Sequence, residues 1–252
     1  MSSPTERFTS RVETYARYRP GYPAEVIELL RSECGLTPAT IVADVGSGTG
    51  IFTEPLLKNG NTVIGVEPNK AMRGAAENLL LGYSKFQSVN GSAEATTLPN
   101  ASVDLITAGQ AFHWFDSAAA RKEFVRILKP GCFVALIWND RRLDSTAFLR
   151  DYEALLREYG TDYAKVQEFN PLDQVARFFA PQSFTHKEFP NRQAFDFAGL
   201  KGRVLSASYT PEPGDPKFEP MIKALHNLFD SNEDNGSVAF EYDTRVFYGQ
   251  LA

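Results

Sequence analysis

The chain has 252 residues, which is ample for one domain with a buried core. Acidic residues outnumber basic residues by 31 to 26, so the formal net charge is −5 at neutral pH. This mild acidity offers no electrostatic footprint for a polyanion, and we therefore expect no nucleic-acid partner. The two cysteines, Cys34 and Cys132, lie far apart, and no cysteine–histidine spacing is typical of a metal site. We expect reduced thiols and no metal.

Long apolar segments are missing from the sequence. The first residues have no apolar stretch of signal-peptide length, and no apolar run elsewhere approaches the length of a membrane span. We therefore expect a cytoplasmic protein with no membrane partner. A monomer and a homodimer both stay open at this stage.

Strands and helices alternate from residue 23 onward. The apolar patterns predict helices at 23–34, 51–59, 69–81 and 117–128, and strands at 41–45, 62–66, 85–89, 102–108 and 132–138. Such alternation implies right-handed crossovers and a parallel sheet. Ligands of these sheets bind at the carboxyl ends of the strands.

The pattern changes after residue 139. An apolar stripe predicts a helix from residue 145 to 160, and we expect 141–181 to form a helical insertion. A strand at 183–189, an amphipathic helix at 218–229 and a terminal strand that includes residues 238, 240 and 242 complete the predicted order.

The most specific signal is the run Ile41-Val42-Ala43-Asp44-Val45-Gly46-Ser47-Gly48-Thr49-Gly50. A short β-branched strand ends there and three alternating glycines follow. Glycine removes the Cβ atoms that keep a ligand away from the backbone, and it permits the positive φ angles of a sharp strand-to-helix turn. Glu67 ends the next apolar run, where a carboxylate can accept both hydroxyls of a ribose. Together these features predict a nucleoside site.

The spacing of the glycines separates two classes of nucleoside ligand. A dinucleotide fingerprint reads G-x-G-x-x-G, whereas the third glycine here comes one residue earlier and gives D-x-G-x-G-x-G. This spacing argues against an NAD-dependent oxidoreductase, which is the weaker alternative. The run resembles motif I of the class I S-adenosylmethionine-dependent methyltransferases.

Further segments strengthen this resemblance. In order, they are Val66-Glu67-Pro68-Asn69, Gly91-Ser92-Ala93-Glu94, Val103-Asp104-Leu105-Ile106, Gln110-Ala111-Phe112-His113-Trp114-Phe115 and Leu128-Lys129-Pro130-Gly131. Their order and spacing resemble the methyltransferase type 11 group, above all its members similar to trans-aconitate and ubiquinone-biosynthesis methyltransferases. Cys132 departs from the second glycine that many relatives carry after Pro-Gly.

The resemblance implies an α/β fold. We expect a Rossmann-like, seven-stranded, mostly parallel sheet with helices on both faces, a last strand that is antiparallel at the sheet edge, and the helical insertion after strand 5. The whole of 1–252 is then a single domain. Its parts are an N-terminal lid segment at 1–22, a cofactor-binding core at 36–140, a substrate lid at 141–181, and C-terminal strands and helices at 182–252.

The resemblance also implies the cofactor S-adenosyl-L-methionine, with S-adenosyl-L-homocysteine as product. The glycine loop, Gln110 and Ala111 would meet its methionine part, and a backbone amide and a side-chain oxygen near Ala93 would border the adenine. The full set of expected cofactor residues is Asp44, Gly46, Ser47, Gly48, Gly50, Glu67, Pro68, Ala93, Glu94, Gln110, Ala111, Arg19 and Tyr15.

The expected activity is methyl transfer to a small organic molecule, an organic acid by analogy with the look-alikes. Such a displacement needs positioning more than a universal catalytic residue. His113 is the one candidate for proton transfer, with a packing role as the alternative. Trp114, Asn139 and Arg141 are expected to border the acceptor pocket. A non-catalytic binding module that keeps the cofactor fold is the main alternative function.

Overall fold

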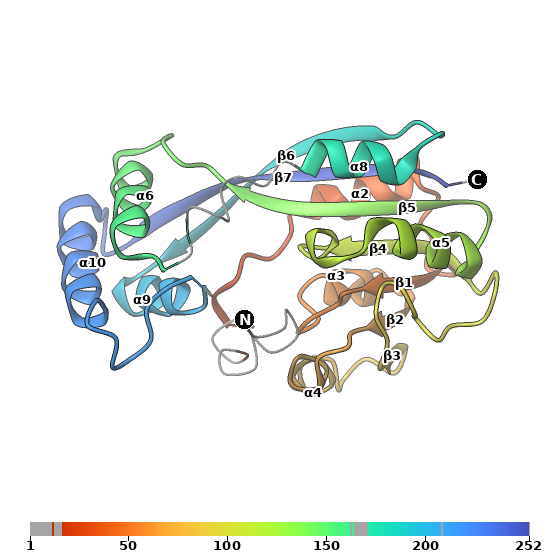
Figure 1. Cartoon of the computed structure of the whole chain (residues 1–252), viewed down its shortest axis with the longest axis horizontal. Coiled ribbons are helices and arrows are strands. Elements are labelled where there is room, and N and C mark those ends of the chain that lie inside the picture. Colours follow the sequence, from red (N-terminus) through yellow and green to blue (C-terminus); the bar gives the residue numbers. More distant parts are fainter. Residues whose placement is uncertain (1–11, 13–16, 162, 164–170, 208, 252) are drawn as a thin grey trace.

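The structure is a computed structural model that describes residues 12, 17–161, 163, 171–207 and 209–251 (Figure 1). Its centre is a seven-stranded sheet in the order β3-β2-β1-β4-β5-β7-β6. The strands are β1 (Ile41–Val45), β2 (Thr62–Val66), β3 (Phe86–Val89), β4 (Val103–Gly109), β5 (Leu128–Arg141), β6 (Thr185–Phe195) and β7 (Val238–Gln250). The first five pair in parallel, and β7 is antiparallel to both β5 and β6. The predicted fold class is confirmed.

The predicted position of the last strand is wrong. β7 lies between β5 and β6, and the edge strand is β6, which pairs with β7 from Thr185 to Phe195. The burial patterns explain this order. Most residues of β7 are buried or half-buried, whereas half-buried and exposed residues alternate along β6. An edge tolerates the more polar strand, since one of its sides is open to water.

Most of the helices match predicted ones, α8 falls within the predicted helical insertion, and α9 is an addition. They are α2 (Ala24–Glu33), α3 (Thr53–Lys58), α4 (Lys70–Leu79), α5 (Ser117–Ile127), α6 (Ala147–Tyr159), α8 (Pro171–Phe179), α9 (Phe197–Leu205) and α10 (Phe218–Asn232). The side chain of Asn69 caps α4 as expected, and Asp116 caps α5 in the same way. The sequence patterns did not anticipate α9.

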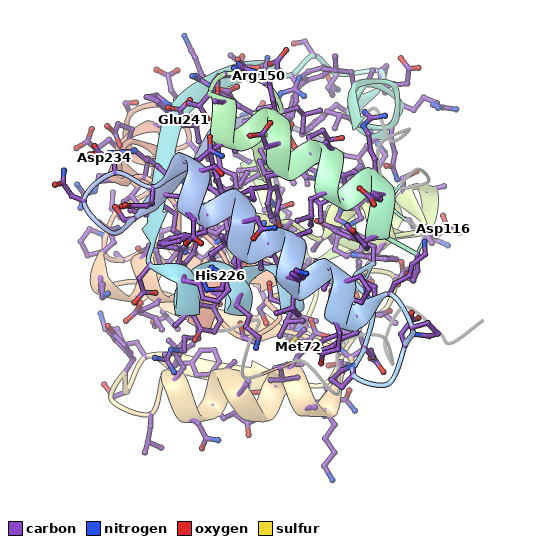
Figure 2. All side chains as sticks on the ribbon, turned by 90° about the vertical axis from the view of Figure 1, so that its left-hand side faces the viewer. Met72, Asp116, Arg150, His226, Asp234 and Glu241 are labelled. Carbon is purple, nitrogen blue, oxygen red and sulfur yellow. The ribbon has the colours of Figure 1, made fainter. Side chains whose placement is uncertain are left out.

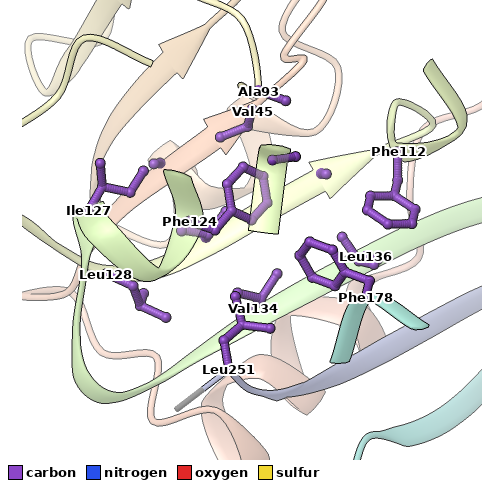
Figure 3. Close-up of a cluster of buried hydrophobic side chains, with 14 of the residues drawn as sticks. Val45, Ala93, Phe112, Phe124, Ile127, Leu128, Val134, Leu136, Phe178 and Leu251 are labelled. Atoms are coloured by element: carbon purple, nitrogen blue, oxygen red, sulfur yellow. The ribbon is translucent and has the colours of Figure 1, made fainter. Parts of the chain in front are cut away.

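Two apolar layers cover the two faces of the core sheet. On one face, α5 and α8 pack over β1, β4 and β5, and Figure 3 shows Phe124 and Phe178 in this cluster. On the other face, α2, α3 and α4 bury their apolar stripes. Because α8 buries Val175, Phe178 and Phe179, it belongs to the core layer, and the role of 141–181 as a substrate lid stays a prediction.

A third cluster lies at the far end of β5, β6 and β7. These three strands run on past the core, at the right of Figure 1, to the group of α6, α9 and α10 at the left. Figure 2 faces that group, with α6 and α10 seen lengthwise and with Arg150 on α6 and His226 on α10 at its surface. The extended strands therefore connect the nucleoside-site end of the sheet with a second helical layer.

Two apolar residues near the predicted site are buried in the core. Met72 and Trp138 are core residues, at 5% and 4% exposure. Cys34 and Cys132 are free thiols. None of the helices in the described ranges combines the length and the apolar composition that crossing a bilayer requires. Nor do the described His, Cys, Asp and Glu side chains gather in a group that could hold a metal ion.

Candidate cofactor site

The glycine loop follows β1 at the carboxyl edge of the sheet. Gly46, Gly48 and Gly50 have φ angles of +69°, +55° and +86°, which side chains rarely adopt. A Cβ atom at Gly46 would lie 2.5 Å from the Cβ of Ala111, and one at Gly50 would lie 2.9 Å from Leu80. A Cβ atom at Gly48 would meet nothing within 4 Å. The outer two glycines are needed for packing, while Gly48 presents bare backbone to open space.

Glu67 holds the tip of this loop. Its Oε2 accepts a hydrogen bond from the N–H of Gly48 at 3.0 Å, and its Oε1 accepts one from the N–H of Asn69 at 2.8 Å. Burial raises the pKa of the Glu67 carboxyl, and the two backbone donors partly oppose that rise. Each oxygen of a carboxylate has two lone-pair sites, so both oxygens can still accept one more donor.

Asp44 lies beneath the loop and is 1% exposed. Its oxygens accept hydrogen bonds from the hydroxyls of Thr53, at 2.6 Å, and Thr107, at 2.9 Å. Burial raises the pKa of this carboxyl to about 6, although the two hydroxyls lower it. Asp44 therefore supports the loop from below. Its direct contact with a cofactor stays a prediction.

Gln110 begins the segment after β4 with a φ of +55°. Its backbone N–H donates to Ile137, and its side-chain Nε2 donates to the carbonyl oxygen of Asn139 at 3.0 Å. Ala111 is buried directly against Gly46. The ends of β1, β2 and β4 thus meet at one place, as the sequence predicted for Gly46–Gly50, Glu67, Gln110 and Ala111.

His113 and Trp114 lie in a short 3-10 helix, Phe112–Trp114, beside this meeting point. Burial lowers the pKa of His113 to about 4, so the imidazole is neutral at pH 7. A general base works best with a pKa near the working pH. The environment of His113 therefore argues for the packing alternative. The indole of Trp114 is 41% exposed, which leaves it accessible at the rim of the site.

The segment from Ser92 to Glu94 approaches the same edge. Ala93 is buried, and the carboxylate of Glu94 accepts a hydrogen bond from the N–H of Asp116 at 2.9 Å. Ser92 and Ala95 exchange backbone hydrogen bonds that close a small turn. The side chain of Glu94 is therefore engaged at the start of α5, and its predicted role at an adenine is untested. Pro68 and Ser47 adjoin Glu67 and Gly48.

The side chain of Asn139 connects β5 with neighbouring strands and with the N-terminal segment. It is buried, accepts from Thr244 at 2.6 Å and from Asn191 at 3.1 Å, and donates to the carbonyl of Gly21 at 3.2 Å. The expected place of Asn139 at the acceptor pocket stays a prediction. Its partners come from segments far away in the sequence, which a local pattern does not reveal.

Arg141 lies at the end of β5, against the layer of α6. Its guanidinium pairs with Glu153 at 2.7 Å and donates to the hydroxyl of Tyr163 at 2.7 Å. One Nη therefore already has partners within that layer. The expected place of Arg141 at the acceptor pocket stays a prediction.

The N-terminal segment reaches from the second helical layer to the cofactor loop. The ring of Tyr18 lies against Gly202 in α9, and Arg19 Nη2 donates to the carbonyl of Ser206 at 3.2 Å. Tyr22 packs edge-on against Phe52, with ring centres 4.6 Å apart, and covers Gly109. The predicted contact of Tyr15 lies outside the described residues. Tyr22, Thr53 and Thr107 were missed by the sequence reasoning, because single polar or aromatic residues carry no motif.

Comparison with known proteins identifies the family. The profile of the methyltransferase domain family matches residues 43–136. An uncharacterized methyltransferase from Schizosaccharomyces pombe is 31% identical over 183 residues, which cover 71% of this chain and 68% of the relative. The chain belongs to the methyltransferase family. The matched core includes the glycine loop, Glu67 and Gln110.

Another relative agrees with this membership, and solved structures share the fold. An uncharacterized methyltransferase from Mycobacterium tuberculosis is 37% identical over 134 residues, and the match spans about half of each protein, 53% of this chain and 52% of the relative. A protein from Anaeromyxobacter dehalogenans named a type II methyltransferase has a TM-score of 0.65 at 22% identity, over 93% of this chain and 98% of its own. Geranyl diphosphate C-methyltransferase from Streptomyces coelicolor, solved with Mg2+, geranyl-S-thiolodiphosphate and S-adenosyl-L-homocysteine, has a TM-score of 0.51 at 13% identity, over 91% and 76%.

Proposed function

We propose that the chain transfers the methyl group of S-adenosyl-L-methionine to a small organic molecule, an organic acid in particular. The observation that carries this proposal is the hydrogen bond from the N–H of Gly48 to the carboxylate of Glu67. A loop with bare backbone at its tip is held by a carboxylate that retains accepting capacity on both oxygens. Two vicinal ribose hydroxyls are donors that suit such a carboxylate.

The site suits a cofactor that lacks phosphate. The third glycine lies outside the dinucleotide spacing, and a Cβ there would strike Leu80 of the following layer. The buried negative charge of Asp44 lies under the loop and favours a ligand that carries positive charge over one that carries a pyrophosphate. The related C-methyltransferase that holds S-adenosyl-L-homocysteine supports the same assignment.

Different residues of the site would bind and orient different parts of the cofactor. When bound, the cofactor supplies an electrophilic methyl group on a sulfonium. Glu67 would accept the ribose hydroxyls, and the backbone of Gly46–Gly50 and of Gln110 would hold the amino-acid end. Tyr22, packed on Phe52 and over Gly109, would keep water from that end. Trp114 would offer an aromatic face to the acceptor at the rim.

A transfer assay tests the proposal. Tritiated S-adenosyl-L-methionine is incubated with the protein and a pool of small metabolites, and the labelled products are separated by charge and size. We expect the label in small organic acids. Label only in RNA or protein, or no label with any acceptor, contradicts the proposal.

A matched pair of variants connects turnover to the site. Glu67→Gln keeps the shape of the side chain but removes its charge. The hydrogen bonds that its two oxygens accept then lose their charge assistance, and a hydrogen bond to a charged group is worth about 1.5–3 kcal/mol. We expect at least a tenfold rise in KM for the cofactor. Glu25→Gln changes an exposed acid on α2 in the same way and leaves turnover unchanged. If the KM for the cofactor rises equally in both variants, Glu67 is not part of the cofactor site.

A further inference from the structure

A cluster of buried charged and aromatic side chains lies where β5, α6, α9 and β7 meet. We call it the arginine–tyrosine cluster. Its members are Arg141, Tyr152, Glu153, Tyr163, Arg203 and Tyr242. It occupies the region where the extended strands reach the helical layer at the left of Figure 1. The cofactor loop does not use any of these residues.

The cluster holds more positive than negative charge. Arg203 is 5% exposed, donates from Nε to the hydroxyl of Tyr242 at 3.4 Å, and lies over the ring of Phe240. Within the described ranges of the chain, no carboxylate forms an ion pair with it. Glu153 pairs with Arg141, but it also accepts from the exposed Arg157 at 2.9 Å. Two buried guanidinium groups therefore share at most one carboxylate.

Three buried donors in the cluster lack an acceptor. Nη1 of Arg203, Nη1 of Arg141 and the hydroxyl of Tyr152 have no hydrogen-bond partner among the described residues. They belong together, since the Arg141 guanidinium lies 5.0 Å from the Tyr152 ring centre and both guanidinium charges act on the Tyr152 phenol. A buried donor without an acceptor destabilises the fold, and an unpaired buried charge does so more strongly. Three such donors at one place therefore indicate that an acceptor is missing.

The cluster lies on the same face of the sheet as the side chain of Asn139. Arg141 follows Asn139 by two residues on β5, so the two side chains share a face about 7 Å apart. The carbonyl of Asn139 binds Gln110 at the loop. Beside Arg203, Gly202 contacts Tyr18, and the chain continues from there to Tyr22 over β4. Asn139 and the segment from Tyr18 to Tyr22 therefore connect the cluster with the cofactor loop.

We propose that the arginine–tyrosine cluster binds a carboxylate group of the methyl acceptor. A carboxylate has four lone-pair sites and accepts paired hydrogen bonds from guanidinium forks. Arg203, Arg141 and Tyr152 are the three donors, and the anion supplies the missing negative charge. This inference rests on the proposed function. Because the cluster lies beyond the strand ends that hold the cofactor loop, the anchored carboxylate is a recognition group and the methyl group goes to another atom.

Calorimetric titration tests the cluster separately from catalysis. The wild-type protein, saturated with S-adenosyl-L-homocysteine, is titrated with succinate, citrate, neutral succinamide and inorganic phosphate at constant ionic strength. We expect succinate or citrate to bind at least tenfold more tightly than succinamide. Absence of this preference, or binding of phosphate alone, overturns the assignment. Failure of S-adenosyl-L-homocysteine itself to bind instead contradicts the proposed function, and it is measured first.

Substitutions in the arginine–tyrosine cluster test whether carboxylates bind there. Arg203→Met should abolish the preference for carboxylates, and Tyr152→Phe, which removes one hydroxyl without a partner, should weaken it about tenfold and leave folding intact. Arg150→Met is the matched control, since Arg150 is an exposed arginine on the same helix as Tyr152 (Figure 2). If Tyr152→Phe and Arg150→Met bind carboxylates as tightly as the wild type, the cluster is not the site.

Discussion

The substitution Asp44→Asn tests how the glycine loop is supported. The wild-type carboxyl is almost fully buried, and its burial raises its pKa from 3.8 to about 6. A carboxyl whose pKa is higher in the folded than in the unfolded protein favours folding only when it is protonated. The stability that protonation provides is complete below pH 3.8 and is lost as the pH rises through about 6.

The magnitude follows from the size of this shift. About two pKa units at 1.36 kcal/mol each correspond to about 3 kcal/mol. Asparagine removes the buried charge and preserves the hydrogen bonds, because its oxygen accepts from one threonine while its amide donates to the other. We expect Asp44→Asn to be up to about 3 kcal/mol more stable than the wild type at pH 8, with the difference vanishing near pH 4.

Urea unfolding of both proteins at the two pH values measures this difference. Asp104→Asn is a control of opposite sign, because Lys129 and the N–H of Ile41 outweigh burial there and lower the carboxyl pKa. That variant should lose stability at pH 8. An Asp44→Asn protein that gains nothing at pH 8, or gains equally at both pH values, would refute the reasoning about the buried charge.

The stability gain should carry a functional cost. A negative charge that is retained under the loop despite its burial favours a cationic ligand. We therefore expect Asp44→Asn to bind S-adenosyl-L-methionine, which carries a sulfonium charge, with a larger loss of affinity than S-adenosyl-L-homocysteine. An equal loss for both ligands would mean that the charge acts only through the fold.

Three further predictions concern the loop and its neighbours. Gly46→Ala should be more destabilising than Gly48→Ala in urea unfolding, because only the former places a Cβ against Ala111, while both carry the strain of a positive φ; the reverse order would contradict the described packing. Affinity for S-adenosyl-L-homocysteine should fall as the pH drops through the raised pKa of Glu67, and this dependence should disappear in Glu67→Gln; an unchanged pH profile in that variant would exclude Glu67 as the titrating group. Burial lowers the pKa of His113 to about 4 in the folded protein, so the wild type should lose stability as the pH falls from 6.5 toward 4. His113→Gln should lose less stability over that range in the same unfolding assay. An equal loss in the two proteins would mean that another group titrates.

The core of the fold was predictable because its signals are local. Apolar runs, a glycine-rich turn and the caps Asn69 and Asp116 each act within a few residues. Parallel strands then bring their carboxyl ends to one edge, and this places Glu67 and Gln110 beside the glycine loop without further information.

The outer part was less predictable because its contacts join distant segments. β7 enters between β5 and β6 through pairings such as Asn139 with Thr244, which are 105 residues apart. The partners of Arg141 come from α6 and from Tyr163, and α9 has a weak apolar pattern of its own. The contacts of Asn139 and Arg141 therefore depend on distant segments, which their place at the end of β5 does not reveal.

Equilibrium titration of the purified protein with S-adenosyl-L-homocysteine tests the central claim most directly. We expect saturable binding at one site, weakened at least tenfold by Glu67→Gln and unaffected by Glu25→Gln. If the folded wild-type protein shows no binding of this ligand or of S-adenosyl-L-methionine, the loop of Gly46, Gly48 and Gly50 is not a cofactor site.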